Sequence, residues 1–160
     1  MSPLERVREY FKTLPFSLEV NLLAQSTHTS PLAAEALGVE VGQIAKTLVF
    51  TGRCDADNKP QGVVVVTSGD VRVDTKKLKI LVGFKPKFAD GDEAQLLTGY
   101  PPGGVCPFDL PQELPVFIDV SMRRFPLVFA AGGTANSAVP VTIDQLLFLT
   151  KGSLCDVCYL

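Results

Sequence analysis

The spacing of apolar residues predicts both helices and strands in the first quarter of the chain. Apolar side chains recur at helical spacing over residues 4–14, and a proline ends that run, so an amphipathic helix is expected first. Residues 16–22 alternate apolar and polar side chains, which is typical of a strand. Ser30 and Pro31 offer a helix N-cap and a first-turn proline, and Gly38 offers a C-cap, which predicts a helix between them.

The rest of the chain predicts more strands than helices. Residues 46–51 and 62–67 are rich in β-branched and aromatic side chains, and a turn-forming segment separates them, so we expect an antiparallel pair. Asp74 can cap a helix that carries Leu78 and Leu81. The remaining predicted elements are helices at 92–97 and 143–149 and strands at 116–120, 127–131 and 138–141.

This order of elements favours an α+β fold with a mixed, largely antiparallel sheet flanked by helices. A chain of 160 residues that is 46% hydrophobic and 20% charged is expected to form a single compact domain over residues 1–160. We find no apolar run of about 18 residues and no signal-peptide pattern, so we expect a cytoplasmic protein without membrane contact.

The formal net charge of -2 argues against nucleic-acid binding by bulk electrostatics, but the charge is unevenly distributed. Residues 72–87 contain six of the fifteen basic side chains and one acid, Asp74. This segment is either an anion-facing stripe or a solvated helix face followed by a loop. The basic residues are Arg72, Lys76, Lys77, Lys79, Lys85 and Lys87.

A loop rich in glycine and proline at residues 99–107 exceeds what a simple connection needs. Gly103 and Gly104 can reach unusual backbone angles, and Pro107 belongs to the rigid flanks. Such a loop can present backbone N–H groups to an anion or to the oxyanion of an attacked ester. A plain tight turn between sheet elements is the alternative.

Three single residues could carry chemistry. Lys46 lies between apolar runs and is either an edge charge or a functional cation held rigidly by its strand. His28 is the only histidine, which excludes most triads and multi-histidine metal sites. Cys106 lies in the glycine-rich loop, but no base is positioned to activate it, so we interpret it as a small loop residue.

The two cysteines Cys155 and Cys158 have a spacing that zinc sites and dithiol redox sites use. A zinc site would need further ligands from distant parts of the chain, and a redox motif is expected after an early strand. We therefore interpret both as reduced, partly buried thiols in a terminal strand, with a thiol-redox or zinc protein as an alternative.

Taken together, the motifs resemble the YbaK/ProX family, the aminoacyl-tRNA deacylases related to the editing domain of bacterial prolyl-tRNA synthetases. The resemblance extends over nearly the whole chain. It rests on the order and spacing of residues 30–39, 44–50, 68–74, 98–108 and 131–134. It implies a compact domain with a mixed, barrel-like sheet, consistent with the predicted elements.

The resemblance also implies the residues of the site. Lys46, Gly103 and Gly104 would take part in catalysis. The residues implied to contact the substrate are Val105, Cys106, Pro107, Gly132, Gly133, His28 and Asn136. No metal or other cofactor is implied. Because an aminoacyl ester is already activated, a positioned water can attack it while loop amides stabilise the oxyanion and Lys46 holds the phosphate or carbonyl.

The implied function is trans-editing: hydrolysis of the ester of a mischarged aminoacyl-tRNA, with tRNA-Pro the expected carrier. The implied partners are the acceptor end of aminoacyl-tRNA and prolyl-tRNA synthetase. Residues 134–138 are less charged than in the subgroup specific for cysteinyl-tRNA, so alanine, cysteine and serine or threonine all stay open. A non-catalytic binder of tRNA 3' ends or of a synthetase is the alternative from another class.

Overall fold

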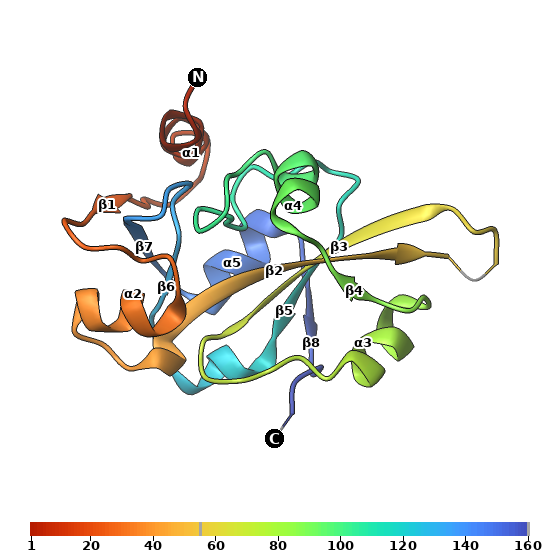
Figure 1. Cartoon of the computed structure of the whole chain (residues 1–160). Helices are drawn as coiled ribbons and strands as arrows, with labels where there is room; N and C mark the ends of the chain where they lie inside the picture. The colour runs from red at the N-terminus through yellow and green to blue at the C-terminus, as the bar shows by residue number, and fades with distance from the viewer. Residues whose placement is uncertain (55, 160) are drawn as a thin grey trace.

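Four consecutive valines explain why strand β3 (Pro60–Ser68) lies at the centre of the fold. Val63 to Val66 are all at most 4% exposed, so both faces of this strand are covered by other elements. A computed structural model describes residues 1–54 and 56–159, which fold as one α+β unit (Figure 1). None of the helices in these two ranges is long and apolar enough to cross a membrane.

The eight strands form one open, mixed sheet with the order β1-β7-β6-β2-β3-β5-β8, and β4 pairs with β2 beside this path. The pairs β1·β7, β6·β7, β2·β3 and β2·β4 are antiparallel, whereas β2·β6, β3·β5 and β5·β8 are parallel. The predicted mixed α+β fold is therefore confirmed, with a sheet that does not close. The other strands are β1 (Asn21–Leu22), β2 (Ile44–Arg53), β4 (Lys87–Phe88), β5 (Val116–Asp119), β6 (Val128–Ala130), β7 (Ser137–Val141) and β8 (Ser153–Cys155).

The helices follow the predictions closely, because their caps are encoded locally. They are α1 (Pro3–Phe11), α2 (Ser30–Leu37), α3 (Thr75–Val82), α4 (Gly91–Thr98) and α5 (Ile143–Thr150), with two 3₁₀ turns, η1 (Val41–Gln43) and η2 (Val120–Arg124). Gly38 and Gly99 end α2 and α4 in the left-handed conformation, and the Asp74 side chain caps α3. The predicted turn at 55–60 falls partly on residue 55, outside the described residues.

Two local predictions are wrong. The strand expected over residues 16–22 is limited to Asn21–Leu22, because β7 provides pairing partners only for these two residues. The N-cap of α2 is Thr29 rather than Ser30, which is already helical. Thr29 has an extended backbone, and its hydroxyl accepts a hydrogen bond from the amide of Leu32.

The helices cover the sheet unevenly, and this leaves one part of β2 open. Residues of α1, α4 and α5 pack with Val49 and Val64 on one face of the sheet. On the other face, α3 packs over Phe50, and α2 packs near Ile44 at the opposite end of β2. Lys46 and Leu48 lie on that face between α2 and α3, because side chains alternate along a strand.

Candidate active site

The open part of β2 is also a gap in the sheet. On the side of β2 that faces away from β3, β6 pairs with Ile44 and Ala45, and β4 pairs with Phe50 and Thr51. Val49 directs its carbonyl to the same edge, where it accepts a hydrogen bond from the amide of Ala89. Because backbone groups alternate in direction along an antiparallel pair, the peptide groups of residue 47 also point toward this gap. No strand within residues 1–54 and 56–159 pairs with them there.

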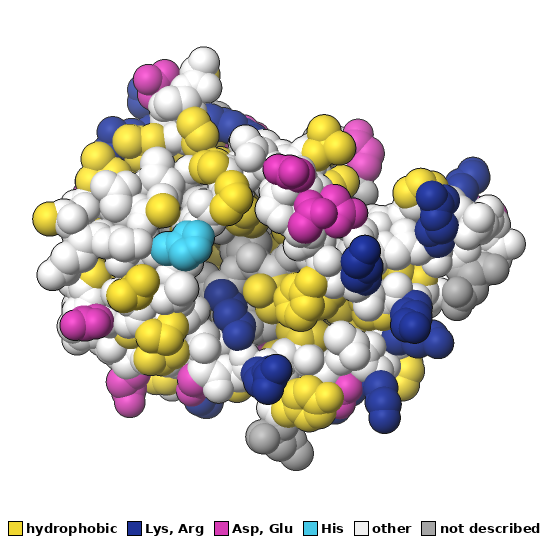
Figure 2. Space-filling view, in the orientation of Figure 1, with side chains coloured by type: hydrophobic (Ala, Val, Ile, Leu, Met, Phe, Trp, Pro, Cys, Tyr) yellow, Lys and Arg dark blue, Asp and Glu magenta, His cyan; other side chains and the backbone are white. Residues whose placement is uncertain are grey.

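A cavity of about 320 Å³ opens at this gap. In the space-filling view it corresponds to the hollow between the histidine, drawn in cyan, and a hydrophobic patch (Figure 2). The wall of the cavity is formed by residues 44–48 of β2, helix α2, the segment 27–29 that precedes it, the glycine-rich loop, and residues of strands β6 and β7 and of the turn between them. The polar residues of the lining are Thr27, His28, Thr29, Ser30, Lys46, Thr47 and Ser137.

Lys46 reaches the cavity from β2 as a half-buried cation. Its Nζ donates a hydrogen bond to the carbonyl oxygen of Val71 at 2.6 Å, which fixes the direction of the side chain. Burial lowers the pKa of Lys46, and the positive charge of Arg72 lowers it further, while Cys158 and Asp70 act in the opposite direction. The structure therefore supplies a positioned cation that gives up its proton more readily than an ordinary lysine.

Thr47 is a site residue that the sequence analysis missed. Its Oγ1 is buried and has no hydrogen-bond partner among the residues that the structure describes. A buried hydroxyl without a partner is costly, so such a group in a cavity wall is a candidate for contact with a ligand. A signal was available: Thr47 is the polar member of the alternating set Ala45, Thr47 and Val49, whose other members are buried.

The glycine-rich loop contributes Gly103 and Val105 to the cavity wall. The backbone N–H groups of these two residues donate to no other described residue. Gly103 has a φ of 81°, and a Cβ atom there would overlap Nδ1 of His28, so only glycine allows the loop to approach the histidine this closely. His28 is exposed and lies at the mouth of the cavity.

Three other glycines that the resemblance places in the site serve close packing. A Cβ atom on Gly104 would lie 2.5 Å from the carbonyl oxygen of Gly133, and the amide of Gly104 already donates to Pro101 O at 2.9 Å. A Cβ atom on Gly132 would lie 2.6 Å from Val20 Cγ1, and one on Gly133 would lie 3.0 Å from Pro3 O. Gly104 thus packs against Gly133, and Gly104, Gly132 and Gly133 are not among the residues that line the cavity.

Cys106 and Pro107 are also not among the residues that line this cavity, so their contact with the substrate stays a prediction. Cys106 is fully buried, and burial raises the pKa of its thiol to about 12. Pro107 is buried and lines a different cleft, beside Tyr10 and Asp109. Val105 thus lines the cavity, whereas the next residue, Cys106, belongs to the buried core cluster.

The side chain of Asn136 forms hydrogen bonds with two other residues of the protein. Its Oδ1 accepts a hydrogen bond from Thr134 Oγ1 at 2.9 Å, and its Nδ2 donates to Leu23 O at 3.3 Å. The next residue, Ser137, donates to Thr134 O and accepts from the amide of Gly132. This turn also positions the segment before α2, because the amide of Thr27 donates to Ala135 O at 2.7 Å.

A set of contacts around the buried ring of Tyr100, behind the loop, was not predicted. The Tyr100 hydroxyl donates to Phe108 O at 2.6 Å and so closes the loop from residue 100 to residue 108. The Arg6 guanidinium lies 4.5 Å above the Tyr100 ring, donates to Thr98 O at 3.0 Å and forms an ion pair with Asp109. These contacts join α1 to both ends of the loop, and nothing in the local sequence indicates them.

The two cysteines near the end of the chain lie in the core. Cys155 belongs to β8, and Cys158 forms an isolated bridge with Val73. Burial raises the pKa of both thiols to about 12, which disfavours the thiolate that metal binding and redox exchange require. Within the described ranges, His, Cys, Asp and Glu side chains form no group of three or more with the geometry of a metal site.

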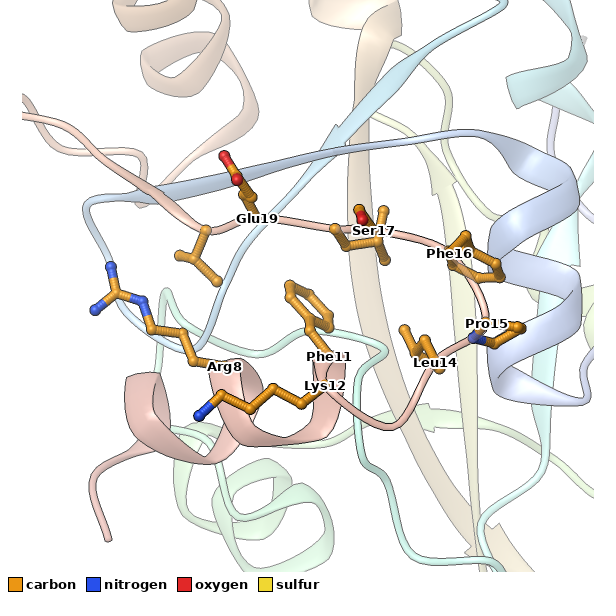
Figure 3. Close-up of a pocket in the computed structure, with 10 residues that line it drawn as sticks. Arg8, Phe11, Lys12, Leu14, Pro15, Phe16, Ser17 and Glu19 are labelled. Carbon is orange, nitrogen blue, oxygen red and sulfur yellow. The ribbon is translucent and has the colours of Figure 1, made fainter.

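A larger and more open cleft, of about 710 Å³, lies between α1 and the segment 14–20 that follows it (Figure 3). Arg8, Phe11 and Lys12 reach it from α1, and Glu19 lies on the opposite segment. Lys12 is paired with Glu9 at 2.8 Å. The lining contains none of the residues that the sequence analysis placed in the site, so we regard the smaller cavity at β2 as the candidate active site.

The fold and the cavity define a class: a small α+β protein whose ligand site lies at a gap in a mixed sheet, between a strand lysine and a glycine-rich loop. A sequence profile described as "Aminoacyl-tRNA editing domain" matches residues 24–149. The chain therefore belongs to the aminoacyl-tRNA editing domain family. This confirms the resemblance to the YbaK/ProX family and the expected enzyme class, an aminoacyl-tRNA deacylase.

Individual relatives agree with this assignment. The chain is 38% identical over 143 residues to the uncharacterized protein YwhH of Bacillus subtilis, covering 89% of this chain and 88% of that one. It is 29% identical over 125 residues to EbsC of Enterococcus faecalis, described as a candidate Cys-tRNA(Pro)/Cys-tRNA(Cys) deacylase, covering 78% and 73% of the two chains. A crystal structure of a candidate trans-editing enzyme for prolyl tRNA synthetase superposes with a TM-score of 0.85 at 36% identity, covering 99% and 98%.

Proposed function

We propose that this protein is a trans-editing hydrolase that cleaves the ester of tRNA-Pro mischarged with alanine, cysteine, serine or threonine. The observation that carries the proposal is that a cation and several polar groups without partners belong to residues that line one cavity. Lys46, Thr47, Gly103 and Val105 all line it. The Thr47 hydroxyl and the amides of Gly103 and Val105 have no partner among the described residues. The descriptions of the relatives support the choice of tRNA-Pro and of prolyl-tRNA synthetase as a partner.

The proposed reaction uses water as the nucleophile. Cys106 is buried behind the loop, whereas the ester carbonyl is already reactive enough for a positioned water. Attack forms a tetrahedral intermediate whose oxyanion accepts hydrogen bonds from the amides of Gly103 and Val105. Lys46 holds the terminal phosphate or the carbonyl oxygen by its charge. The adjacent ribose hydroxyl takes a proton from the attacking water as it gives its own proton to the departing ribose oxygen, so the ester C–O bond breaks to the free amino acid and an intact ribose.

The cavity lining is suited to an apolar or weakly polar amino acid. It includes Ala33, Ala45, Ala130, Ala131 and Ala138 and no acidic side chain, so it offers apolar contacts and no carboxylate partner. Shape alone separates side chains that differ by one methylene or one hydroxyl by only about 1–3 kcal/mol. The unpaired Thr47 hydroxyl is the group placed to improve this discrimination by a hydrogen bond to the amino acid.

A panel of mischarged tRNAs tests the proposal. The purified protein is incubated with tRNA-Pro that carries alanine, cysteine, serine, threonine or proline, and ester hydrolysis is followed against the uncatalysed rate. We expect hydrolysis of at least one small non-cognate ester and none of the prolyl ester. Hydrolysis of no ester above the uncatalysed rate, together with binding of the tRNA, would instead support a non-catalytic binder of tRNA 3' ends.

A further inference from the structure

The face that carries the cavity also carries the basic segment 72–87. Lys and Arg side chains gather over the half of this face that holds α3 and the β2–β3 hairpin, next to a hydrophobic patch (Figure 2). Arg72, Lys76, Lys79, Lys85 and Lys87 are all exposed. The single acid of the segment, Asp74, is engaged as the N-cap of α3. The segment therefore presents a local positive charge on a protein whose net charge is -2.

Phe88 is an exposed aromatic residue beside the cavity, and one side of its ring is already covered. It lies directly opposite Phe50 in the β4·β2 pairing, so both side chains are on the same face of the sheet. The two ring centroids are 4.5 Å apart with an interplanar angle of 32°. Phe50 is fully buried, whereas Phe88 is 57% exposed, so the outer side of the Phe88 ring is open to solvent.

The position of Phe88 relative to the candidate active site follows from β2. Lys46, Leu48 and Phe50 share one face of this strand, and Lys46 and Leu48 line the cavity. At about 3.3 Å per residue, the four-residue step from Lys46 to Phe50 spans about 13 Å. A flat group on Phe88 would thus lie outside the cavity but within reach of a chain whose end is held at Lys46.

We propose that Phe88, backed by Phe50 and flanked by Lys85 and Lys87, is a stacking platform for an unpaired base of the RNA strand whose esterified end enters the cavity. The proposal rests on the function proposed above and extends it to the path of the substrate. Single strands bind where aromatic rings stack on bases and lysines contact the backbone phosphates. Because of the distance to Lys46, the stacked base precedes the esterified nucleotide.

The test compares Phe88→Ala with a matched control, Phe148→Ala. Phe148 is 59% exposed and also packs against a second aromatic ring, Phe16, at 5.6 Å, but it lies on α5. The first probe is a labelled RNA hairpin with an unpaired CCA 3' end and no amino acid. We expect Phe88→Ala to weaken its binding by about tenfold, Phe88→Trp to retain it and Phe148→Ala to leave it unchanged.

Kinetics with two substrates locate the effect. On aminoacyl-tRNA, Phe88→Ala should raise KM by about tenfold with kcat retained, because the platform acts on binding. On an aminoacyl-adenosine, which has no preceding nucleotide, the same variant should act like wild type. Equal binding and KM for the two alanine variants would overturn the proposal, and so would an equal loss on both substrates, which would indicate damage to the cavity.

The binding assay needs no turnover, so it separates this proposal from the proposed function. A wild-type protein that hydrolyses no ester would contradict the proposed editing activity, while a Phe88-dependent affinity for the hairpin would still support the platform.

The salt dependence of hairpin binding tests independently whether the lysines beside Phe88 contact phosphates. Lys87→Ala should reduce the slope of log affinity against log salt by about 0.7, as for one lost phosphate contact. Lys12→Ala, at the residue that follows α1, should not change the slope.

Discussion

The two sides of the glycine-rich loop differ in how their polar groups are satisfied. On the side of the cavity, the Thr47 hydroxyl and the amides of Gly103 and Val105 have no partner among the described residues. On the opposite side, Tyr100 and Arg6 direct their polar groups to specific acceptors at 2.6–3.0 Å. Groups that a fold leaves without partners mark where a ligand can bind, and groups with complete partners mark what holds that place rigid.

Removing the Lys46 cation is expected to have the largest effect. Lys46→Met keeps the apolar stem of the side chain and removes the charge that holds the substrate. We expect kcat/KM for deacylation to fall by about a hundredfold to a thousandfold, the range for loss of one electrostatic contact in a transition state. Denaturant unfolding should show little loss of stability, because burial already disfavours the charged form. Wild-type turnover in this variant would remove Lys46 from the reaction.

Raising the pH should remove the same cation without a mutation. Burial lowers the pKa of Lys46 below 10.5, so an activity that needs its charge is lost as the pH rises through this lowered pKa. After subtraction of uncatalysed hydrolysis, the alkaline limb of kcat/KM should begin below 10.5. Lys46→Arg should move the limb to higher pH, because arginine stays protonated. An identical limb in both proteins would assign it to another group.

The lowered pKa of Lys46 also predicts how the stability of the fold changes with pH. Because the folded-state pKa of Lys46 lies below its unfolded value, the unfolded chain binds more protons between the two pKa values. The contribution of Lys46 to the free energy of unfolding should therefore rise with pH across this window. Denaturant titrations of wild type and Lys46→Met at several alkaline pH values isolate this contribution as their difference.

Gly104 lies on the packed side of the loop, so Gly104→Ala should reduce the stability of the fold more than it reduces substrate binding. The added Cβ atom would lie 2.5 Å from Gly133 O and 2.6 Å from Gly133 C, and backbone cannot move aside as a flexible side chain can. We expect a loss of about 1–3 kcal/mol in the free energy of unfolding, as for an overpacked core. Chemical denaturation measures it, and an unchanged midpoint would show that the two segments can separate at no cost.

Thr47→Val tests the hydroxyl of Thr47 alone, and it should lower activity without lowering stability. The substitution keeps the shape of the side chain and removes a buried hydroxyl that has no partner, so stability should be unchanged or slightly higher. We expect kcat/KM for the preferred amino acid to fall by about tenfold, with less effect on the others. A uniform loss over all amino acids would place Thr47 at the common part of the substrate instead.

Asn136→Ala should have the smallest effect. It removes the side-chain contacts with Thr134 and Leu23, which hold an exposed turn, so we expect a cost of about 1 kcal/mol in thermal or chemical unfolding. Deacylation should stay within about twofold of wild type. A large loss of activity with normal stability would return Asn136 to the substrate-contacting group that the family resemblance implies.

The elements were predictable from the sequence because their signals are local. Caps at Asp74, Gly38 and Gly99 and the valine run of β3 determine most boundaries without reference to the rest of the chain. The segment 16–20 failed because an alternating pattern shows only that a strand is possible. Pairing depends on a distant partner, and β7 provides one only for the next two residues.

The candidate site was predictable in position but not in detail. Lys46 and Gly103, which the family resemblance implies for the site, line one cavity, whereas Cys106 and Pro107 are not among its lining residues. Proximity in the chain did not distinguish them, since the direction of each peptide in a loop depends on contacts such as Tyr100 with Phe108. Thr47 was missed because its significance is a lack of partners, which becomes visible only in three dimensions.

In the proposed reaction, the Lys46 cation and the unpartnered Thr47 hydroxyl act on the substrate, whereas Cys106 and Asn136 do not. Single-turnover hydrolysis of the best mischarged tRNA by Lys46→Met, Thr47→Val, Cys106→Ala and Asn136→Ala tests it directly. We expect slow reactions for the first two variants, each with nearly normal stability. We expect nearly wild-type rates for the last two in the folded fraction of each protein. Loss of turnover in folded Cys106→Ala or Asn136→Ala, with normal turnover in Lys46→Met, would contradict the proposed roles of these residues.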